Sequence, residues 1–395
     1  MSFAHTEIVN LDYAASTPLR LSAIDAQREY DNGPLAGVNP NSLHSLGRAA
    51  AQKLEGCRRS LAQTLGQSVR PSEVIFTGGG TEANAMALLG IAEGARQSNK
   101  QRTRVLISAI EHDSMLDNIP LLHAAGFTTD LILPNSHGVI EAKTLASMMD
   151  DSVALVSVML ANNETGAVQP IADLAACAHE HGAYFHTDAI QGFLHVPLDI
   201  DSLGIDALSL AGHKIGGPVG VGALYLKTRT PFRPRIFGGG QEAGRRPGTQ
   251  DLRQIIALTA AASEVYPNVA HDFARLTELS NALYDRLVKH PLIRATIGEY
   301  RKVDHLPGIV SITVDNFDSE DLILQLDARG FEVSAGSACT SGNQDASHVL
   351  LAMGIPRNRA LGSLRISFDD RIDPASLDRF CSCLFELIGE PHAGC

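Results

Sequence analysis

Ala183-Tyr184-Phe185-His186-Thr187-Asp188 is an apolar run with a polar end, and it belongs to a series of such runs between residues 72 and 227. The others cover residues 73–76, 105–108, 154–158, 207–210 and 222–226, with helical stretches between them. This alternation predicts βαβ units and a mixed, mainly parallel sheet flanked by helices, an α/β fold. Because ligands bind beyond the carboxyl ends of such strands, the polar residues after each run are the candidate site.

The remainder of the chain predicts a smaller α+β unit. A long helix is expected from residue 251 to about 288, followed by a strand at 308–314, a helix at 319–325, a strand at 365–368 and a helix at 373–388. We therefore expect an N-terminal arm (1–15) packed with the small domain, a large ligand-binding domain (16–260) and a small C-terminal domain (261–395).

Composition restricts the possible partners. The 395 residues are 44% hydrophobic and 19% charged, with a net charge of −12, which argues against a nucleic acid or an anionic membrane as the main partner. The start lacks a signal-peptide pattern, and no apolar stretch is long enough to span a membrane, so a cytoplasmic protein is expected. Six scattered cysteines do not suggest a disulfide framework.

One cysteine has unusual neighbours. Cys339 lies in Ser334-Ala335-Gly336-Ser337-Ala338-Cys339-Thr340-Ser341-Gly342, a run of small residues that predicts a mobile loop and a reactive thiol. The simpler alternative is an unreactive free cysteine in a flexible loop. Cys57, by contrast, falls on a helical stripe of packing residues.

A metal site near the C-terminus is the other use of cysteine that the sequence allows. Its ligands would be Cys381, Cys383, His392 and Cys395. The helix start at Asp373-Pro374 places Cys381 and Cys383 on different faces, so no metal site is expected.

Two motifs fit a phosphorylated cofactor. Thr77-Gly78-Gly79-Gly80-Thr81 opens a helix, which favours an anion through free backbone N–H groups and the helix dipole. Asp188 and Lys214 follow neighbouring runs and should share one edge of the sheet. Pyridoxal phosphate requires this pair: a lysine for the Schiff base and a carboxylate that keeps the pyridine nitrogen protonated.

With these motifs the chain resembles the cysteine desulfurases. These enzymes belong to the class V aminotransferase group and are fold type I pyridoxal phosphate enzymes. The resemblance spans nearly the whole chain, and the Cys339 loop is similar to the long-loop branch. The shared motifs include Leu11-Asp12-Tyr13-Ala14-Ala15, Asn39-Pro40-Asn41-Ser42-Leu43-His44, Glu111-His112, Asn162-Asn163-Glu164-Thr165-Gly166, His186-Thr187-Asp188-Ala189-Ile190-Gln191, Gly212-His213-Lys214 and Gly238-Gly239-Gly240-Gln241-Glu242.

The resemblance implies a role for each candidate residue. Lys214 would form the Schiff base and move a proton, His112 would stack on the ring and assist proton transfer, and Cys339 would receive sulfur as a persulfide. Arg365 would hold the substrate carboxylate. The remaining cofactor contacts would come from Asp188 at the pyridinium, Gln191 at the ring hydroxyl, Asn163 near the ring oxygen and the substrate carboxylate, Gly80, Thr81 and His213 at the phosphate, and Thr249 at the phosphate of a partner subunit.

The implied reaction converts L-cysteine to L-alanine, with sulfur passed to an acceptor such as an iron–sulfur scaffold or a sulfur carrier. The resemblance also implies a homodimer. Two alternatives stay open: a selenocysteine or cystine lyase without persulfide storage, and an inactive scaffold for sulfur-carrier partners. One departure from the family is Ala211, which stands where a serine usually contacts the phosphate. The absence of that serine would remove a hydrogen bond worth about 0.5–1.5 kcal/mol. Ser209, two residues earlier, is not expected to replace it.

Overall fold

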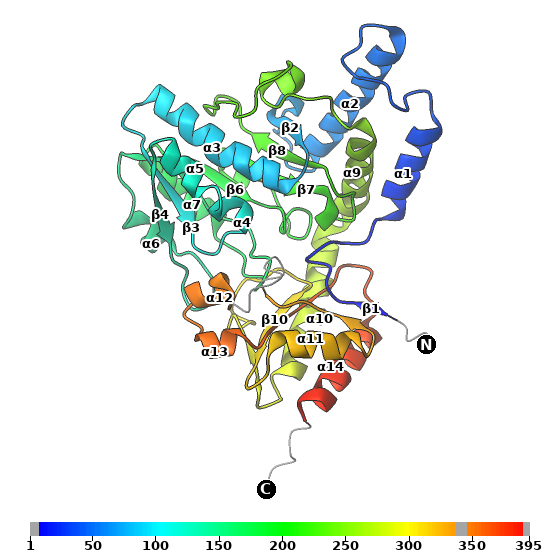
Figure 1. The fold of residues 1–395 in the computed structure, drawn as a ribbon, viewed down its shortest axis with the longest axis vertical. Coiled ribbons are helices and arrows are strands. Elements are labelled where there is room, and N and C mark those ends of the chain that lie inside the picture. Colours follow the sequence, from blue (N-terminus) through cyan, green and yellow to red (C-terminus); the bar gives the residue numbers. More distant parts are fainter. Residues whose placement is uncertain (1–7, 337–345, 390–395) are drawn as a thin grey trace.

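A seven-stranded sheet forms the centre of the larger part of the molecule, in the upper half of Figure 1. The structure is a computed structural model that describes residues 8–336 and 346–389. In sheet order the strands are β2 (Val74–Thr77), β8 (Gly222–Leu226), β7 (Ala207–Ala211), β6 (Tyr184–Asp188), β5 (Val153–Ser157), β3 (Arg104–Ser108) and β4 (Thr128–Ile132). Only β8 is antiparallel to its neighbours. The predicted α/β fold with a mixed, mainly parallel sheet is confirmed.

Helices cover both faces of this sheet. The long helix α3 (Gly80–Ser98) packs on one face, against β5, β6, β7 and β8. The others in this part are α1 (Leu21–Asn32), α2 (Ser45–Gln63), α4 (Asp113–Leu116), α5 (Ile119–Ala124), α6 (Ala142–Ala146), α7 (Ile171–Glu180), α8 (Ile200–Leu203) and α9 (Leu252–Val265).

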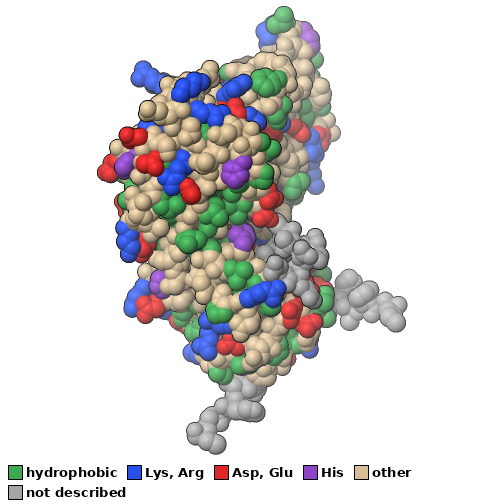
Figure 2. Space-filling view, turned by 60° about the vertical axis from the view of Figure 1, so that its left-hand side comes forward, with side chains coloured by type: hydrophobic (Ala, Val, Ile, Leu, Met, Phe, Trp, Pro, Cys, Tyr) green, Lys and Arg blue, Asp and Glu red, His purple; other side chains and the backbone are tan. Residues whose placement is uncertain are grey.

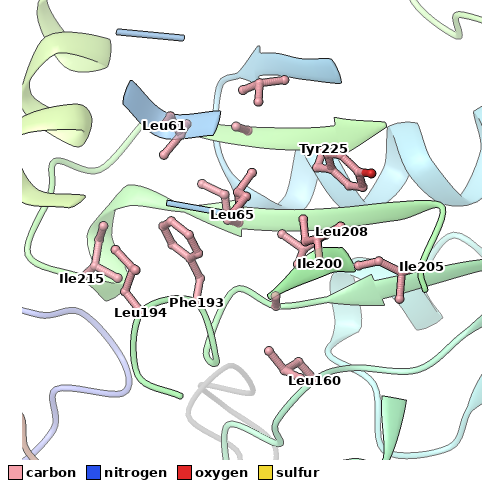
Figure 3. Packing of buried hydrophobic residues seen from close by; sticks show 14 of the residues in the cluster. Leu61, Leu65, Leu160, Phe193, Leu194, Ile200, Ile205, Leu208, Ile215 and Tyr225 are labelled. Atoms are coloured by element: carbon pink, nitrogen blue, oxygen red, sulfur yellow. The ribbon is translucent and has the colours of Figure 1, made fainter. Parts of the chain in front are cut away.

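Neighbouring residues of a strand in the central sheet enter different cores. Val74 and Phe76 of β2 belong to one buried cluster and Ile75 to another, which also contains the inner face of α3. Figure 3 shows part of the first cluster, where Leu61 approaches the strand that carries Tyr225. Burial of both faces explains why these strands are continuous apolar runs.

The smaller part has its own sheet, in the order β12 (Ser363–Ser367), β10 (Ile309–Val314) and β9 (Ile293–Ala295). Its helices are α10 (Val269–Leu287), α11 (Ser319–Asp327), α12 (His348–Ala352), α13 (Arg357–Ala360) and α14 (Pro374–Ile388). Near the N-terminus, β1 (Val9–Asn10) pairs in parallel with β11 (Phe331–Glu332), and Val9 and Leu11 lie in the core of this smaller part.

The predicted continuous helix from 251 to 288 is wrong. A 3-10 turn, η4 (Tyr266–Asn268), separates α9 from α10 because Pro267 has no backbone N–H to donate. The helices on the two sides of this junction pack into different hydrophobic cores. Val269, at the start of α10, packs in the core of the larger part, whereas Leu276 packs in the core of the smaller part. Within the described residues, no helix is both long and apolar enough to cross a membrane.

Candidate active site

A cavity of about 310 Å³ lies between the two parts, beyond the carboxyl ends of β6 and β7. These strands are parallel neighbours, so the residues that follow them meet at one edge of the sheet. Of the residues predicted from the sequence, Gly80, Thr81, His112, Asn163, Asp188, Gln191, His213, Lys214 and Arg365 line the cavity. Thr249 does not, and Cys339 lies outside the described residues.

Lys214 ends the short 3-10 turn η2 (Gly212–Lys214) that follows β7. Its Nζ donates hydrogen bonds to the carbonyl oxygens of Ala14 at 2.5 Å and Ala15 at 3.0 Å. The N-terminal segment therefore closes one side of the cavity and directs the lysine amine.

Asp188 is the last residue of β6 and is buried. One carboxylate oxygen accepts from Asn84 Nδ2 at 2.6 Å and the other from the backbone N–H of Ile190 at 2.8 Å. Burial raises the pKa of this carboxyl, and the two hydrogen bonds oppose that effect. Asn84, which is held by α3, was not identified as a site residue from the sequence.

The glycine loop leads into α3 through Gly79, whose φ of 147° is accessible only to glycine. A Cβ on Gly80 would lie 2.3 Å from Ile190 Cδ1 and 3.3 Å from the Ala211 methyl group. The first turn of α3 therefore packs closely against these residues, and its Gly80 and Thr81 line the cavity. Ser209 Oγ is instead 2.9 Å from His186 Nε2, so Ser209 is engaged elsewhere.

His112 and Glu111 also line the cavity. His112 caps α4, its Nδ1 accepting from the Ser114 backbone N–H at 3.0 Å. Glu111 Oε1 accepts from Ser108 Oγ and from the Met159 N–H, both at 2.6 Å, while no described residue partners Oε2. Burial, with a smaller contribution from Asp188, raises the pKa of Glu111 to about 8.

Arg365 projects from β12 and is one of the residues that the smaller part contributes to the cavity. Its side chain is only 2% exposed. Nη1 donates to the Asn163 carbonyl oxygen at 2.9 Å, and Nη2 pairs with Asp12 Oδ1 at 2.7 Å. No described residue accepts from Nε.

A second unpredicted carboxyl, Glu164, joins the two parts beside Arg365. It is buried and accepts from Ser347 Oγ at 2.5 Å, and burial raises its pKa. Gly336 also lines the cavity, three residues before Cys339 in the sequence. Glu111 and Glu164 both belong to motifs that the sequence shares with the family. The sequence did not identify them as site residues because their burial, which sets them apart from exposed acids, is visible only in the structure.

The residues present fit pyridoxal phosphate. An amine, a buried carboxylate and a helix N-terminus face one cavity, and the described residues supply no partner for Gln191 Oε1, which is buried at its edge. The described residues contain no cluster of His, Cys, Asp and Glu that could hold a metal ion. Cys381 and Cys383 are both buried, and burial raises the pKa of Cys381 to about 11.

Comparisons with known proteins give the same class. Residues 9–380 match the class V aminotransferase family, and the chain belongs to that family. It is 39% identical to the IscS-like cysteine desulfurase of Mycobacterium tuberculosis over 93% of both chains. A solved NifS-like protein superposes with a TM-score of 0.87 at 29% identity, covering 96% of this chain and 99% of the other. SspA, solved in complex with cysteine, has a TM-score of 0.78 at 31% identity, covering 91% and 98%.

Within this family, the relatives identify the activity. The chain is a pyridoxal phosphate-dependent cysteine desulfurase. The predicted family, enzyme class and cofactor are confirmed, whereas the roles of individual residues stay predictions.

Proposed function

We propose that this enzyme takes sulfur from L-cysteine, releases L-alanine and stores the sulfur as a persulfide on Cys339 until an acceptor protein receives it. One observation carries the proposal. The Lys214 amine, the Asp188 carboxylate and the Arg365 guanidinium surround a single cavity, and Gly336, just before the Cys339 segment, forms part of its wall. SspA, of similar fold, has been solved with cysteine bound.

Each residue has a distinct task in this proposal. Pyridoxal phosphate, when bound, supplies an electron-poor ring that makes the substrate Cα proton acidic. Asp188 keeps the ring nitrogen protonated, and the Lys214 amine removes and returns the Cα proton. Arg365 binds the substrate carboxylate, for which its fork of N–H donors is well suited. The substrate carboxylate would either displace Asp12 from Arg365 Nη2 or bind Arg365 Nε, which has no acceptor among the described residues.

The sulfur step balances without an added oxidant or reductant. The Cys339 thiolate attacks the substrate sulfur, an S–S bond forms and the Cβ–S bond breaks. The electron pair of the broken bond stays on Cβ, which takes up a proton and becomes the methyl group of alanine. The net change is cysteine plus enzyme thiol to alanine plus enzyme persulfide.

The partners follow from the same chemistry. We propose that the acceptor is an iron–sulfur scaffold or another sulfur-carrier protein, and that two copies of the chain form the enzyme. Acidic and basic side chains are interspersed on the face shown in Figure 2, and a net charge of −12 disfavours nucleic acid. Four unpaired cysteines among the described residues fit a reducing, cytoplasmic setting.

The test is the fate of sulfur in single variants. Cys339→Ala should abolish persulfide formation, detected by mass spectrometry after a single turnover, and reduce alanine release at least a hundredfold, on the order of the losses seen when a catalytic nucleophile is removed. Lys214→Ala should abolish alanine release and the visible absorbance of the bound cofactor. Cys177→Ala, which removes a partly buried thiol on α7, is the matched control and should behave like the parent.

The two alternatives predict other results. A lyase without persulfide storage would release sulfide from cysteine at full rate in Cys339→Ala. An inactive scaffold would release no alanine even in the parent protein. Transfer of radiolabelled sulfur from cysteine to co-purified proteins would identify the acceptor.

A further inference from the structure

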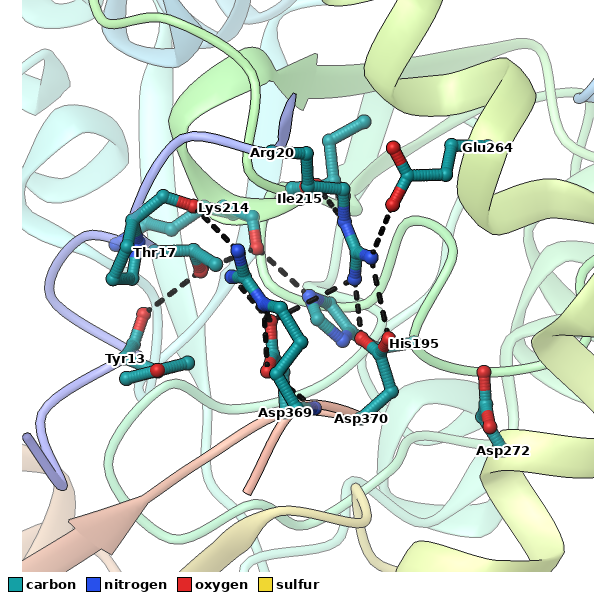
Figure 4. Close-up of polar contacts among 12 residues, drawn as sticks. Tyr13, Thr17, Arg20, His195, Lys214, Ile215, Glu264, Asp272, Asp369 and Asp370 are labelled. Atoms are coloured by element: carbon teal, nitrogen blue, oxygen red, sulfur yellow. Dashed lines mark hydrogen bonds and ion pairs between the residues drawn. The ribbon is translucent and has the colours of Figure 1, made fainter. Parts of the chain in front are cut away.

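The backbone around Lys214 is held by side chains from two other segments (Figure 4). The Lys214 carbonyl oxygen accepts from Thr17 Oγ1 at 2.8 Å and from His195 Nε2 at 2.9 Å. The next carbonyl, that of Ile215, accepts from Arg20 Nε at 3.1 Å. The direction of the lysine side chain is therefore set by its main chain as well as by the cavity.

Arg20 also contacts the smaller part of the molecule. Its Nη1 lies 3.2 Å from Asp370 Oδ2 and its Nη2 donates to Asp370 Oδ1, both in the smaller part. Nη1 also lies 3.0 Å from Glu264 Oε1 on α9, in the larger part. The side chain is only 6% exposed. Burial alone would lower the pKa of this guanidinium, but its hydrogen bonds to Asp370 and Glu264 raise it, so the charge is firmly held.

The turn that contains Asp370 continues directly from β12, the strand of Arg365. Asp369, in the same turn, lies 3.7 Å from Arg20 and is paired with Arg371, whose Nη1 donates to the Pro18 carbonyl oxygen. One buried guanidinium thus joins the Lys214 turn to the end of the Arg365 strand.

We propose that Arg20 is a positioning residue that fixes the distance between Lys214 and Arg365. The inference rests on the proposed roles of these two residues, an amine that acts at Cα and a guanidinium that holds the carboxylate on the same carbon. These two groups must fit one small substrate at once, and they belong to different parts of the chain. Arg20 is buried where the two parts meet and bonds to both.

The test compares Arg20→Gln, Arg20→Lys and the control Arg28→Gln, which breaks an exposed pair on α1. Arg20→Gln should raise KM for L-cysteine more than it lowers kcat, with kcat/KM reduced by roughly tenfold to a hundredfold, the cost of a misplacement of about 1 Å. Without substrate, it should also shift the pH midpoint of the visible cofactor absorbance, because the Lys214 turn loses a donor.

Arg20→Lys keeps the charge but cannot bond Ile215 and both carboxylates together, so it should recover part of kcat/KM. Arg28→Gln should match the parent. The proposal is overturned if Arg20→Gln lowers the unfolding temperature while KM, kcat and the absorbance midpoint stay at parental values. If Arg20→Gln does not fold, Asp370→Asn removes the same link from the other side and is measured in its place. Failure of the proposed function would look different: Lys214→Ala or Cys339→Ala would then keep activity.

Discussion

Asp188 and Glu111 are two buried carboxyl groups at one cavity, and their surroundings give them different tasks. Asp188 accepts two hydrogen bonds, from Asn84 and Ile190, which favour its charged form. Glu111 has one oxygen without a described partner, and the Asp188 charge adds to the effect of burial on its pKa. Burial raises the pKa of both carboxyls, but His112 and Lys214 lower that of Asp188, so we infer that Asp188 is better placed than Glu111 to carry charge opposite the cofactor nitrogen.

The raised pKa of Glu111, about 8 against an ordinary 4.5, predicts a pH-dependent stability. The folded state keeps a proton that the unfolded state loses, so this contribution is full below pH 4.5 and is lost as pH rises towards about 8. Glu111→Gln, which cannot ionise, should remove that slope. Its free energy of unfolding relative to the parent should rise between pH 5 and pH 8 by about 1 kcal/mol or more, since a tenfold change in proton affinity corresponds to about 1.4 kcal/mol.

Urea unfolding at several pH values measures this difference. Glu332→Gln, at an exposed carboxyl on β11, should keep the parental slope. A parallel pH course for Glu111→Gln and the parent would contradict the prediction.

At the residue scale, the sequence alone identified charged residues that directly follow an apolar strand. Asp188 and Lys214 follow apolar runs, and a parallel sheet brings such residues to one edge. Glu111, Asn84 and Asp12 could not be assigned in this way. Their importance depends on burial and on partners far away in the sequence, which no local pattern encodes.

At the scale of elements, the turn η3 (Gln241–Gly244) is tied to the sheet by a buried ion pair. Glu242 accepts from Arg58 Nη1 at 2.6 Å and Nη2 at 2.9 Å, and also from the backbone N–H of Phe76 on β2. Glu242 is in the left-handed region, with φ of 49°, and its carboxylate is 1% exposed. Arg58 and the other donors hold its pKa below the usual range despite burial.

Glu242→Gln should therefore be destabilising, by up to about 3–5 kcal/mol, because Arg58 loses its buried counter-ion and keeps only the half-exposed Glu55. The matched control is Asp31→Asn, which breaks a solvent-exposed pair with Arg253 and should cost much less stability. Chemical denaturation of both variants measures the contrast. Equal losses in the two would show that the buried pair contributes no more than the exposed one.

Two features that the sequence did not predict have separate physical reasons. β4 is an edge strand, Thr128–Ile132, with exposed polar positions, so it lacks the apolar run that marks the central strands. The break between α9 and α10 was hidden because apolar spacing continues on both sides of Pro267. Strong periodicity predicts that an element exists; its boundaries depend on single residues.

At the scale of the whole molecule, β1 near the N-terminus packs against the smaller part. The mutual placement of the larger and smaller parts was not predictable, since it rests on side chains that join them, such as Arg20, Arg365 and Glu164. The position of Thr249 also has to be explained at the scale of the whole molecule. It is exposed and does not line the cavity of its own chain.

We therefore expect Thr249 to act on the cavity of a second copy, and mixed dimers test this. Lys214→Ala removes the reactive amine from a subunit, and Thr249→Ala weakens phosphate binding by about 1 kcal/mol or more, the worth of a hydrogen bond to a charged group. A dimer of one Lys214→Ala subunit and one Thr249→Ala subunit has one site with an intact Lys214 from one chain and an intact Thr249 from the other. Unfolding, mixing and refolding the two variants should restore parental cofactor affinity to that fraction of sites, measured by absorbance titration. If Thr249 acted within its own chain, no mixture would contain an intact site, and the titration would show only the weakened affinity.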